Sequence, residues 1–384
     1  MKKILVVFGT RPEAIKMAPV VKILGQAAEF AAVTAVTAQH RQMLDQVLEL
    51  FAIKPDYDLD IMQPGQTLTE ITTRALLGLQ TVLERENPDL VLVHGDTTTT
   101  LAGSLAAYYR QIPVGHVEAG LRTFNKYAPF PEELNRKLTG ALTDLHFAPT
   151  ATAKGNLLRE AVPPGAIVVT GNTVIDALLR TVKPQYRFGD ALLDGLDFTG
   201  HRVILITAHR RENLGEPLRR IFNAIKALVA ANPETEAIFP VHLNPKVQEL
   251  ARAILGGRER IHLIEPLDYE PFANLLNRSY LVLTDSGGVQ EEAPALGKPV
   301  LVLRDTTERP EAIAAGTVKM VGTDPEKLFN ETNILLRDRQ AYLQMANAVN
   351  PYGDGQAAAR ILQALRVFFG LSQEPVAEFF RHEV

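Results

Sequence analysis

The sequence predicts an α/β protein built on two doubly wound, Rossmann-like parallel sheets. Short runs rich in Val, Ile and Leu alternate along the chain with longer segments of helical periodicity. These runs are nearly continuously apolar rather than alternating, which is typical of strands buried on both faces. The chain has 384 residues, which is long for one hydrophobic core and suits two domains.

The apolar runs give the expected strands in chain order. In the first half of the chain they are residues 4–8, 33–37, 90–94, 114–117 and 145–148. In the second half they are residues 203–207, 237–241, 261–264, 281–284, 300–303 and 318–321. Nearly every gap between them is long enough for a crossover helix, so we expect the strands of each sheet to run parallel.

The domain boundary is predicted near residues 183–200, where a polar stretch spotted with Gly and Asp leads to a fresh strand. We therefore expect an N-terminal domain over 1–182 and a C-terminal domain over 183–355. Residues 356–384 should form a last helix and a tail that pack back on the N-terminal domain. Doubly wound sheets bind ligands at the carboxyl ends of their strands, so we expect the two domains to face each other across a ligand-binding cleft.

Composition excludes several classes of function. A net charge of −4 gives no reason to expect nucleic-acid binding, and the absence of Cys excludes disulfides and thiolate metal sites. The first apolar run is too short for a signal peptide, and no run approaches the ~20 residues of a membrane span. No dinucleotide-binding, P-loop or metal-ligand motif is present. We expect a cytoplasmic protein that binds neither membrane, metal nor redox cofactor.

The run TDSGGVQEE at residues 284–292 is the most informative motif. It follows a predicted strand and opens a predicted helix. A turn of Ser286, Gly287 and Gly288 would place amide N–H groups and a hydroxyl at a helix N-terminus, which is a general site for phosphate. Glu292, one helical turn later, suits hydrogen bonds from a diol such as ribose. Together these features indicate a nucleotide.

Charged side chains follow other predicted strands. Arg11 and Lys16 follow the first strand, and the alternative is that they are solvated charges on a capped helix. Asp96 follows the third strand, and from its motif alone a helix cap is the better interpretation. His209, beside two arginines, suits a phosphate partner or a proton shuttle.

Three further acids come after the strand at residues 114–117. Glu118 stands between that strand and a glycine, where it has no evident structural role. Glu132 and Glu133 follow a Pro-rich loop at the start of a helix, and for Glu133 we favour a structural role that complements the helix dipole. Asp96, Glu118 and Glu132 are then carboxylates available for proton transfer, while the cations hold a diphosphate.

Together, these motifs resemble those of the bacterial non-hydrolysing UDP-N-acetylglucosamine 2-epimerases over essentially the full length. The resemblance implies the two-domain fold of the GT-B glycosyltransferases, a homodimer, and interconversion of UDP-GlcNAc and UDP-ManNAc through loss of UDP to 2-acetamidoglucal. The matching stretches are FGTRPEAIKMAP (8–19), AQHRQMLDQV (38–47), VLVHGDTTTT (91–100), IPVGHVEAGLRT (112–123), PEE (131–133), GNTVIDA (171–177), HRREN (209–213), PVHLNP (240–245), TDSGGVQEEAP (284–294), RDTTERPE (304–311) and NPYGDG (350–355).

The resemblance also assigns roles to residues of this chain. Asp96 and Glu132 are expected to form the acid–base pair, with Glu118 in support. His209 and Arg11 are expected to stabilise the departing diphosphate. The UDP moiety is expected to be held by Lys16, Phe272, Ser286, Gly287, Gly288, Glu292 and Arg309. A second UDP-GlcNAc, acting as allosteric activator, is expected at Gln39, His40, Gln42 and His242.

Three other functions remain open from the sequence. A hydrolysing 2-epimerase would release free ManNAc and UDP, and it shares the catalytic carboxylates but not the activator residues. A GT-B glycosyltransferase would keep the nucleotide site but gives no reason for three carboxylates. A UDP-sugar-binding sensor would bind without exchanging the C2 proton.

Overall fold

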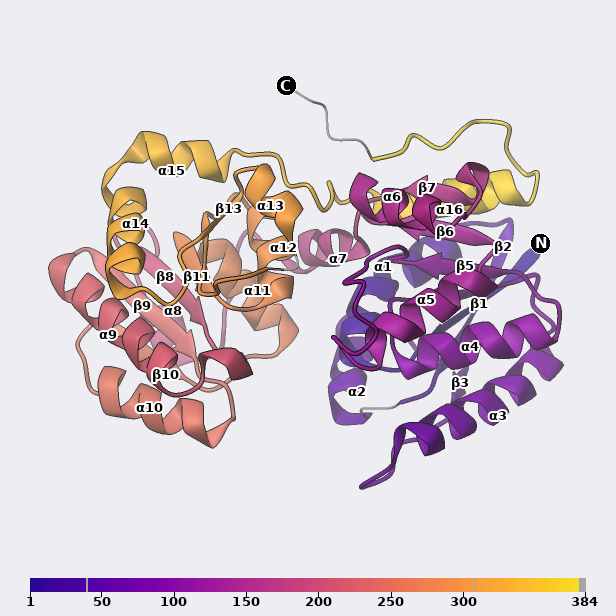
Figure 1. Ribbon diagram of the computed structural model, residues 1–384, viewed down its shortest axis with the longest axis horizontal. Coiled ribbons are helices and arrows are strands. Elements are labelled where there is room, and N and C mark those ends of the chain that lie inside the picture. The colour runs from indigo at the N-terminus through magenta and orange to yellow at the C-terminus, as the bar shows by residue number, and fades with distance from the viewer. Residues whose placement is uncertain (39–40, 308, 380–384) are drawn as a thin grey trace. The chain divides into compact units, whose positions relative to one another are not determined.

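The computed structural model describes residues 1–38, 41–307 and 309–379, and it divides into two compact units. Unit 1 comprises Met1–Ala177 and Tyr352–Val384, and unit 2 comprises Leu178–Pro351. Each unit is a parallel sheet with interleaved helices, as Figure 1 shows. The sequence placed the first boundary at 182/183, whereas the units divide at 177/178, inside a helix. The chain returns to unit 1 at Tyr352.

The sheet of unit 1 has seven strands in the order β3-β2-β1-β4-β5-β6-β7. Every pairing in it is parallel. The order reverses between β1 and β4, which places a topological switch point at the carboxyl ends of these neighbours. The strands are β1 (Lys2–Phe8), β2 (Phe30–Val36), β3 (Tyr57–Asp58), β4 (Leu90–His94), β5 (Val114–Val117), β6 (Leu145–Ala148) and β7 (Ile167–Val169).

The helices of unit 1 follow from sequence signals at their ends. α3 begins with a capping box formed by Thr67 and Glu70, and α6 is capped by Thr150. α16 packs against α1, and Arg366 of α16 pairs with Glu29, which follows α1 in the chain. The helices are α1 (Arg11–Gln26), α2 (Arg41–Leu50), α3 (Leu68–Glu86), α4 (Thr98–Tyr109), α5 (Glu132–Leu142), α6 (Ala151–Arg159), η1 (Pro164–Ala166), α7 (Thr173–Thr181) and α16 (Ala357–Phe368).

The sheet of unit 2 has six parallel strands in the order β10-β9-β8-β11-β12-β13, with its switch point between β8 and β11. The strands are β8 (Arg202–Thr207), β9 (Thr235–Pro240), β10 (Ile261–Ile264), β11 (Leu281–Thr284), β12 (Val300–Val302) and β13 (Val318–Met320). The helices are α8 (Ala191–Gly195), η2 (Arg211–Asn213), α9 (Glu216–Ala231), α10 (Pro245–Leu255), α11 (Tyr269–Arg278), α12 (Gly287–Ala295), α13 (Pro310–Ala314), α14 (Pro325–Arg337) and α15 (Arg339–Ala346).

The central strands are buried on both faces, as their continuous apolarity predicts. All five residues of β4 and all four of β11 are buried. Phe222 of α9 packs on Phe239 of β9 in the core of unit 2, with ring centroids 5.5 Å apart. The predicted fold class is therefore confirmed. None of the described helices, over 1–38, 41–307 and 309–379, is both long and apolar enough to cross a membrane.

The structure adds two strands that the sequence did not predict. β3 is two residues long and pairs only with β2 in the described chain. β7 is three residues long and follows the short η1 turn that begins at Pro164. Both are edge strands, and each is shorter than the apolar runs from which strands are recognised.

Candidate active site

One buried carboxylate, Glu13 in α1, joins the two turns at the switch point of unit 1. One of its oxygens accepts the amide N–H groups of Gly9 at 3.1 Å and Thr10 at 2.8 Å, after β1. The other accepts the hydroxyls of Thr97 at 2.7 Å and Thr100 at 3.2 Å, after β4. Burial raises the pKa of Glu13, which these hydrogen bonds oppose. Glu13 thus fixes the β1–α1 and β4–α4 turns relative to each other.

Asp96 lies in the β4–α4 turn, and its carboxylate ion-pairs with Arg136 of α5. Gly95 permits this turn with a φ of +70°. Asn135 donates to the Asp96 carbonyl at 3.0 Å. The predicted alternative, that Asp96 caps the next helix, is wrong: the cap of α4 is Thr97, which accepts the amide of Thr100.

Glu118 follows β5 and lies among several cationic and polar groups. Its carboxylate pairs with Lys16 of α1, accepts Asn172 Nδ2 at 3.0 Å, and lies 3.5 Å from Arg136 Nη2. Burial by itself would raise the pKa of Glu118, but Lys16, His94 and Arg136 together hold it well below its usual range. Lys16 is therefore not a solvated surface charge. Glu118 is an ionised carboxylate in a nearly closed setting, with its side chain 7% exposed.

The backbone of Glu118 is strained. Its φ of +63° lies in the left-handed region, which costs a non-glycine residue about 1–2 kcal/mol. Arg136 Nη1 donates to the Glu118 carbonyl, and Ala119 N–H bonds Phe147 O at 3.0 Å, so both sides of the turn are held. This conformation directs the carboxylate toward Lys16 and Arg136 rather than along the strand. Strain of this kind is concentrated at functional sites.

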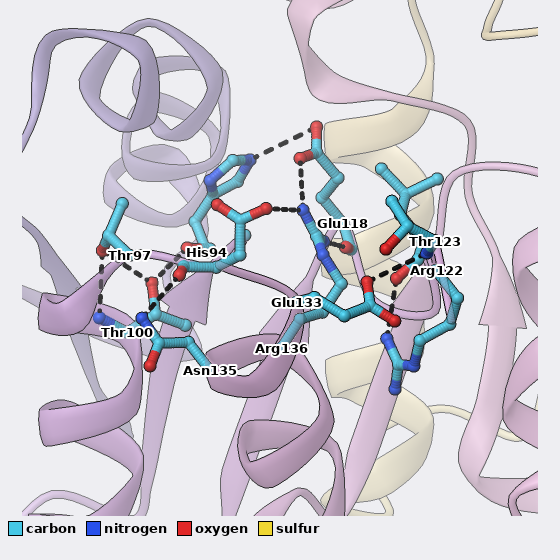
Figure 2. Close-up of polar contacts among 12 residues, drawn as sticks. His94, Thr97, Thr100, Glu118, Arg122, Thr123, Glu133, Asn135 and Arg136 are labelled. Atoms are coloured by element: carbon cyan, nitrogen blue, oxygen red, sulfur yellow. Dashed lines mark hydrogen bonds and ion pairs between the residues drawn. The ribbon is translucent and has the colours of Figure 1, made fainter. Parts of the chain in front are cut away.

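His94, the last residue of β4, is a buried histidine without a hydrogen-bond partner on either ring nitrogen in the described part of the chain. Its Nε2 lies 3.8 Å from Glu118 Oε2 (Figure 2). Burial lowers the pKa of His94 to about 4, against the attraction of Glu118. The ring is consequently neutral near pH 7. His94 belongs to the motif VLVHGDTTTT (91–100). Its contact with Glu118 joins residues at the ends of two neighbouring strands, and the sequence did not predict it.

The two acids that begin α5 have different environments. Glu133 is buried, and its carboxylate accepts hydrogen bonds from the amide of Thr123 at 2.9 Å (Figure 2) and from the amide of Phe124 at 2.9 Å. Glu133 therefore has a structural role, as the sequence predicted. It fulfils this role by binding the backbone of the preceding loop. Glu132 is half-buried, and within the described chain its carboxylate has no hydrogen bond or ion pair. Arg11 is exposed at the first position of α1.

Unit 2 contains the β11–α12 turn that the sequence predicts to bind an anion. Ser286 is the N-cap position of α12, yet its hydroxyl makes no capping hydrogen bond. Its amide donates to Thr284 Oγ1 at 2.9 Å. A Cβ on Gly287 would lie 3.1 Å from the guanidinium carbon of Arg309, so glycine lets that cation lie close against the turn without displacement. Arg309 is held there by Glu291, 2.9 Å from its Nε.

The remaining predicted nucleotide residues lie on α11 and α12. Glu292 is buried on α12 and accepts the hydroxyl of Tyr269 at 3.0 Å. Burial raises the pKa of Tyr269 well above its usual value, and the neighbouring Glu292 carboxylate raises it further. Gly288 is exposed beside Gly287, and its Cβ would lie 3.8 Å from Glu292. Phe272 is half-buried on α11, on the same helix as Tyr269.

His209 follows β8 and lies at the switch point of unit 2. Its ring stacks on that of His242, with centroids 5.0 Å apart and planes at 7°. Burial lowers the pKa of His209, which the nearby Asp285 carboxylate opposes. Of the predicted activator residues, Gln39 and His40 lie outside the described residues, and Gln42 falls in α2 with its side chain undescribed. The remaining predicted activator residue is His242, which contacts the predicted catalytic residue His209.

The sequence of this chain is similar over most of its length to one known protein family. A model of the family described as UDP-N-acetylglucosamine 2-epimerase matches residues 22–366. A UDP-N-acetylglucosamine 2-epimerase of Bacillus subtilis is 57% identical over 378 residues, which cover 98% of this chain and 98% of the relative. The chain belongs to this family.

Solved structures agree with membership in the UDP-N-acetylglucosamine 2-epimerase family. A structure from Listeria monocytogenes has 56% identity and a TM-score of 0.94, covering 99% of this chain and 100% of that chain. The UDP-GlcNAc 2-epimerase of Neisseria meningitidis, solved bound to UDP-GlcNAc, has 52% identity and a TM-score of 0.85, covering 94% and 99%. The predicted GT-B class of fold is thereby confirmed.

Several residues of this family member were missed by reasoning from its sequence. They lie on helices, at the end of a strand or in buried turns, and their side chains contact predicted residues or the turns that carry them, which no local pattern signals. No cluster of three or more His, Asp or Glu side chains suited to a metal ion occurs within residues 1–38, 41–307 and 309–379. The missed residues are Glu13, His94, Asn135, Arg136, Asn172 and Asp285.

Proposed function

We propose that this protein interconverts UDP-GlcNAc and UDP-ManNAc without releasing the free sugar. A carboxylate removes the C2 proton while the bond from C1 to the diphosphate oxygen breaks, which forms the C1–C2 double bond of 2-acetamidoglucal. UDP then adds again at C1, and a proton is delivered to the other face of C2. No net oxidation occurs, so the reaction requires no redox cofactor. Because the C2 proton is weakly acidic, departure of the diphosphate must assist its removal.

The observation that carries this proposal is the pair of carboxylates held by one buried guanidinium in unit 1. Arg136 ion-pairs with Asp96 and contacts both the carbonyl and the carboxylate of Glu118. Side-chain exposure is 30% for Asp96 and 7% for Glu118, so Asp96 is the carboxylate more accessible to a substrate. This supports Asp96, with the unpaired Glu132, as the acid–base pair and Glu118 as a charged support.

Charge around the turn of unit 2 supports the role assigned to the diphosphate. Gly287 brings the Arg309 guanidinium against the first residue of α12, where amide N–H groups and the helix dipole favour an anion. We propose that Ser286, Gly287, Gly288 and Arg309 hold the diphosphate, with His209, Arg11 and Lys16 stabilising it on departure. Phe272 and Glu292 then contact the uridine, with Glu292 accepting hydrogen bonds from the ribose.

Regulation and assembly belong to the same proposal. The contact of His242 with His209 supports a second UDP-GlcNAc near His242 as an activator. Exposed apolar side chains lie on α3, α4 and α5, of which α4 packs against both others, and they support a homodimer through these helices. They are Leu77, Tyr108, Tyr109, Leu134 and Leu138. The cytoplasmic location and a supply of ManNAc for cell-surface polysaccharide stay predictions.

Product analysis tests the proposed reaction. Purified protein is incubated with UDP-GlcNAc, and the sugars and nucleotides are separated at intervals. We expect UDP-ManNAc to accumulate until the two UDP-sugars reach equilibrium, with free UDP remaining at trace levels. Free UDP rising in proportion to free ManNAc would establish the hydrolysing reaction instead. Absence of any 2-epimer without an added acceptor would contradict the proposal and favour a glycosyltransferase.

A further inference from the structure

Asp285 precedes the anion-binding turn and has no part in the function proposed above. It is fully buried and follows β11. Its Oδ2 accepts three hydrogen bonds from the segment after β8: the amides of His209 and Arg210, each at 2.8 Å, and Asn213 Nδ2 at 3.0 Å. This oxygen has a structural role, because it holds the backbone that carries His209.

The other carboxylate oxygen of Asp285 has no such role. Oδ1 is buried and accepts no hydrogen bond within the described chain. A buried charged oxygen without a donor is costly and calls for an explanation. The facing group is the His209 ring, whose Nδ1 lies 3.4 Å from Oδ1. That separation is an ion-pair distance, slightly longer than a formed hydrogen bond.

We propose that Asp285 is a positioning residue that keeps the proton of neutral His209 on Nδ1 and leaves Nε2 for the substrate. A carboxylate oxygen can only accept hydrogen bonds, so a lone pair on Nδ1 would be repelled by Oδ1, whereas an N–H is attracted. His242 stacks on the ring face and limits its rotation, while Asp285 selects the nitrogen. The action of Nε2 on a diphosphate rests on the proposed function; the tautomer does not.

The arrangement also decides where a second proton binds. With Nδ1–H facing Asp285, a proton taken up by His209 goes to Nε2, and the carboxylate stabilises the resulting imidazolium. Such a cation can donate from Nε2 to a departing diphosphate. The other charged and titratable groups near the ring are His242 and Arg210, and both oppose protonation, as burial does. Asp285 is the group that favours the cation.

Asp285→Asn offers a sharp test because Oδ2 accepts three donors. The amide oxygen of the new Asn must occupy the Oδ2 position, since an NH₂ group there would face three N–H groups. The NH₂ group is therefore directed at His209 Nδ1, which must then accept. We expect the variant to move the proton of neutral His209 from Nδ1 to Nε2, with the loop geometry kept.

The tautomer is read by ¹⁵N NMR of the full chain labelled at histidine, at about pH 8, where an imidazole is neutral. His209→Gln identifies the His209 signals. We expect the Nδ1–H form in the wild type and the Nε2–H form in Asp285→Asn. Asn213→Ala is the matched control: it removes one donor from Oδ2 but leaves Oδ1 unchanged, so the wild-type tautomer is expected.

Two results would overturn the proposal: an Nε2–H wild type, or an Asp285→Asn protein with the wild-type tautomer. If Asp285→Asn does not fold, the wild-type spectrum alone decides. Turnover of UDP-GlcNAc should fall by about 10²-fold or more in Asp285→Asn. The alkaline limb of its pH profile, where His209 loses its Nε2 proton, should shift to lower pH, while Asn213→Ala keeps the wild-type profile. A wild type without epimerase activity would refute the proposed function and leave the tautomer result standing.

Discussion

Arg136 and Asp96 form an ion pair at the switch point of unit 1, with guanidinium Nη2 facing carboxylate Oδ2. The same guanidinium donates from Nη1 to the carbonyl of Glu118, whose carboxylate lies 3.5 Å from Nη2. One buried side chain on α5 therefore sets the positions of two acids that follow neighbouring strands, β4 and β5. A planar fork reaches these acceptors simultaneously, whereas an ammonium group acts as a point charge.

Arg136→Met should destabilise the protein strongly. It leaves the Glu118 and Asp96 carboxylates without their shared cation, and breaking a buried pair costs about 3–5 kcal/mol. Urea unfolding measures the free energy. Arg136→Lys is the matched variant: it keeps the charge and should lose less stability, yet turnover should still fall because Asp96 and Glu118 lose their fixed geometry. Wild-type turnover in Arg136→Lys would refute this positioning role.

Stability should fall as pH drops below about 6.5, through three buried histidines. Burial lowers the pKa of both His94 and His146 from 6.5 to about 4, and it holds the pKa of His116 well below 6.5. The unfolded chain therefore takes up protons on these rings first, and stability present above pH 6.5 is lost progressively toward pH 4. Each ring should account for about 2 kcal/mol at pH 5.

Urea unfolding at several pH values between 6.5 and 5 measures this slope, in a window above the ordinary pKa of most carboxyl groups. His146→Gln removes one of the three rings and should flatten the slope by roughly a third of its size. A slope unchanged by that substitution would show that His146 takes no part.

Continuous apolar runs predicted the fold because buried parallel strands must be apolar on both faces. The predictable part of the site has the same origin: in parallel sheets, polar residues such as Asp96 and Glu118 that directly follow a strand lie at one edge. Arg136 and Asn172 were not predictable in this way. They reach Glu118 from the helix α5 and from the segment before α7, and helical periodicity does not specify which distant carboxylate a side chain contacts.

Two adjacent residues compete for the N-cap position of α4, which explains why the prediction that Asp96 is the cap was wrong. Asp and Thr are both suitable N-cap residues, and the chain has Asp96 next to Thr97. The structure uses Thr97 as the cap, which leaves the Asp96 carboxylate to Arg136. Sequence alone does not rank two adjacent caps, because the deciding interaction comes from a helix 40 residues away.

Gly287→Ala should weaken UDP binding. The added Cβ would lie 3.1 Å from the Arg309 guanidinium carbon, so the guanidinium must shift by a few tenths of an ångström from its position at the turn. Loss of one charge-assisted hydrogen bond to phosphate corresponds to about 1.5–3 kcal/mol, measurable by calorimetry with UDP. Gly288→Ala is the matched control, because its Cβ meets only Glu292 at 3.8 Å, and it should lose less affinity. Equal losses in both variants would contradict a role for Arg309.

The central claim is that the Asp96 carboxylate takes part in proton transfer at C2 of a UDP-sugar. Exchange of the C2 hydrogen of UDP-GlcNAc, followed by NMR in deuterium oxide, tests it most directly. The wild type should place deuterium at C2 of both UDP-GlcNAc and UDP-ManNAc. Asp96→Asn should keep its fold and its affinity for UDP while exchange slows by about 10²–10⁴-fold. Exchange at the wild-type rate in Asp96→Asn, or none in the wild type, would contradict the account.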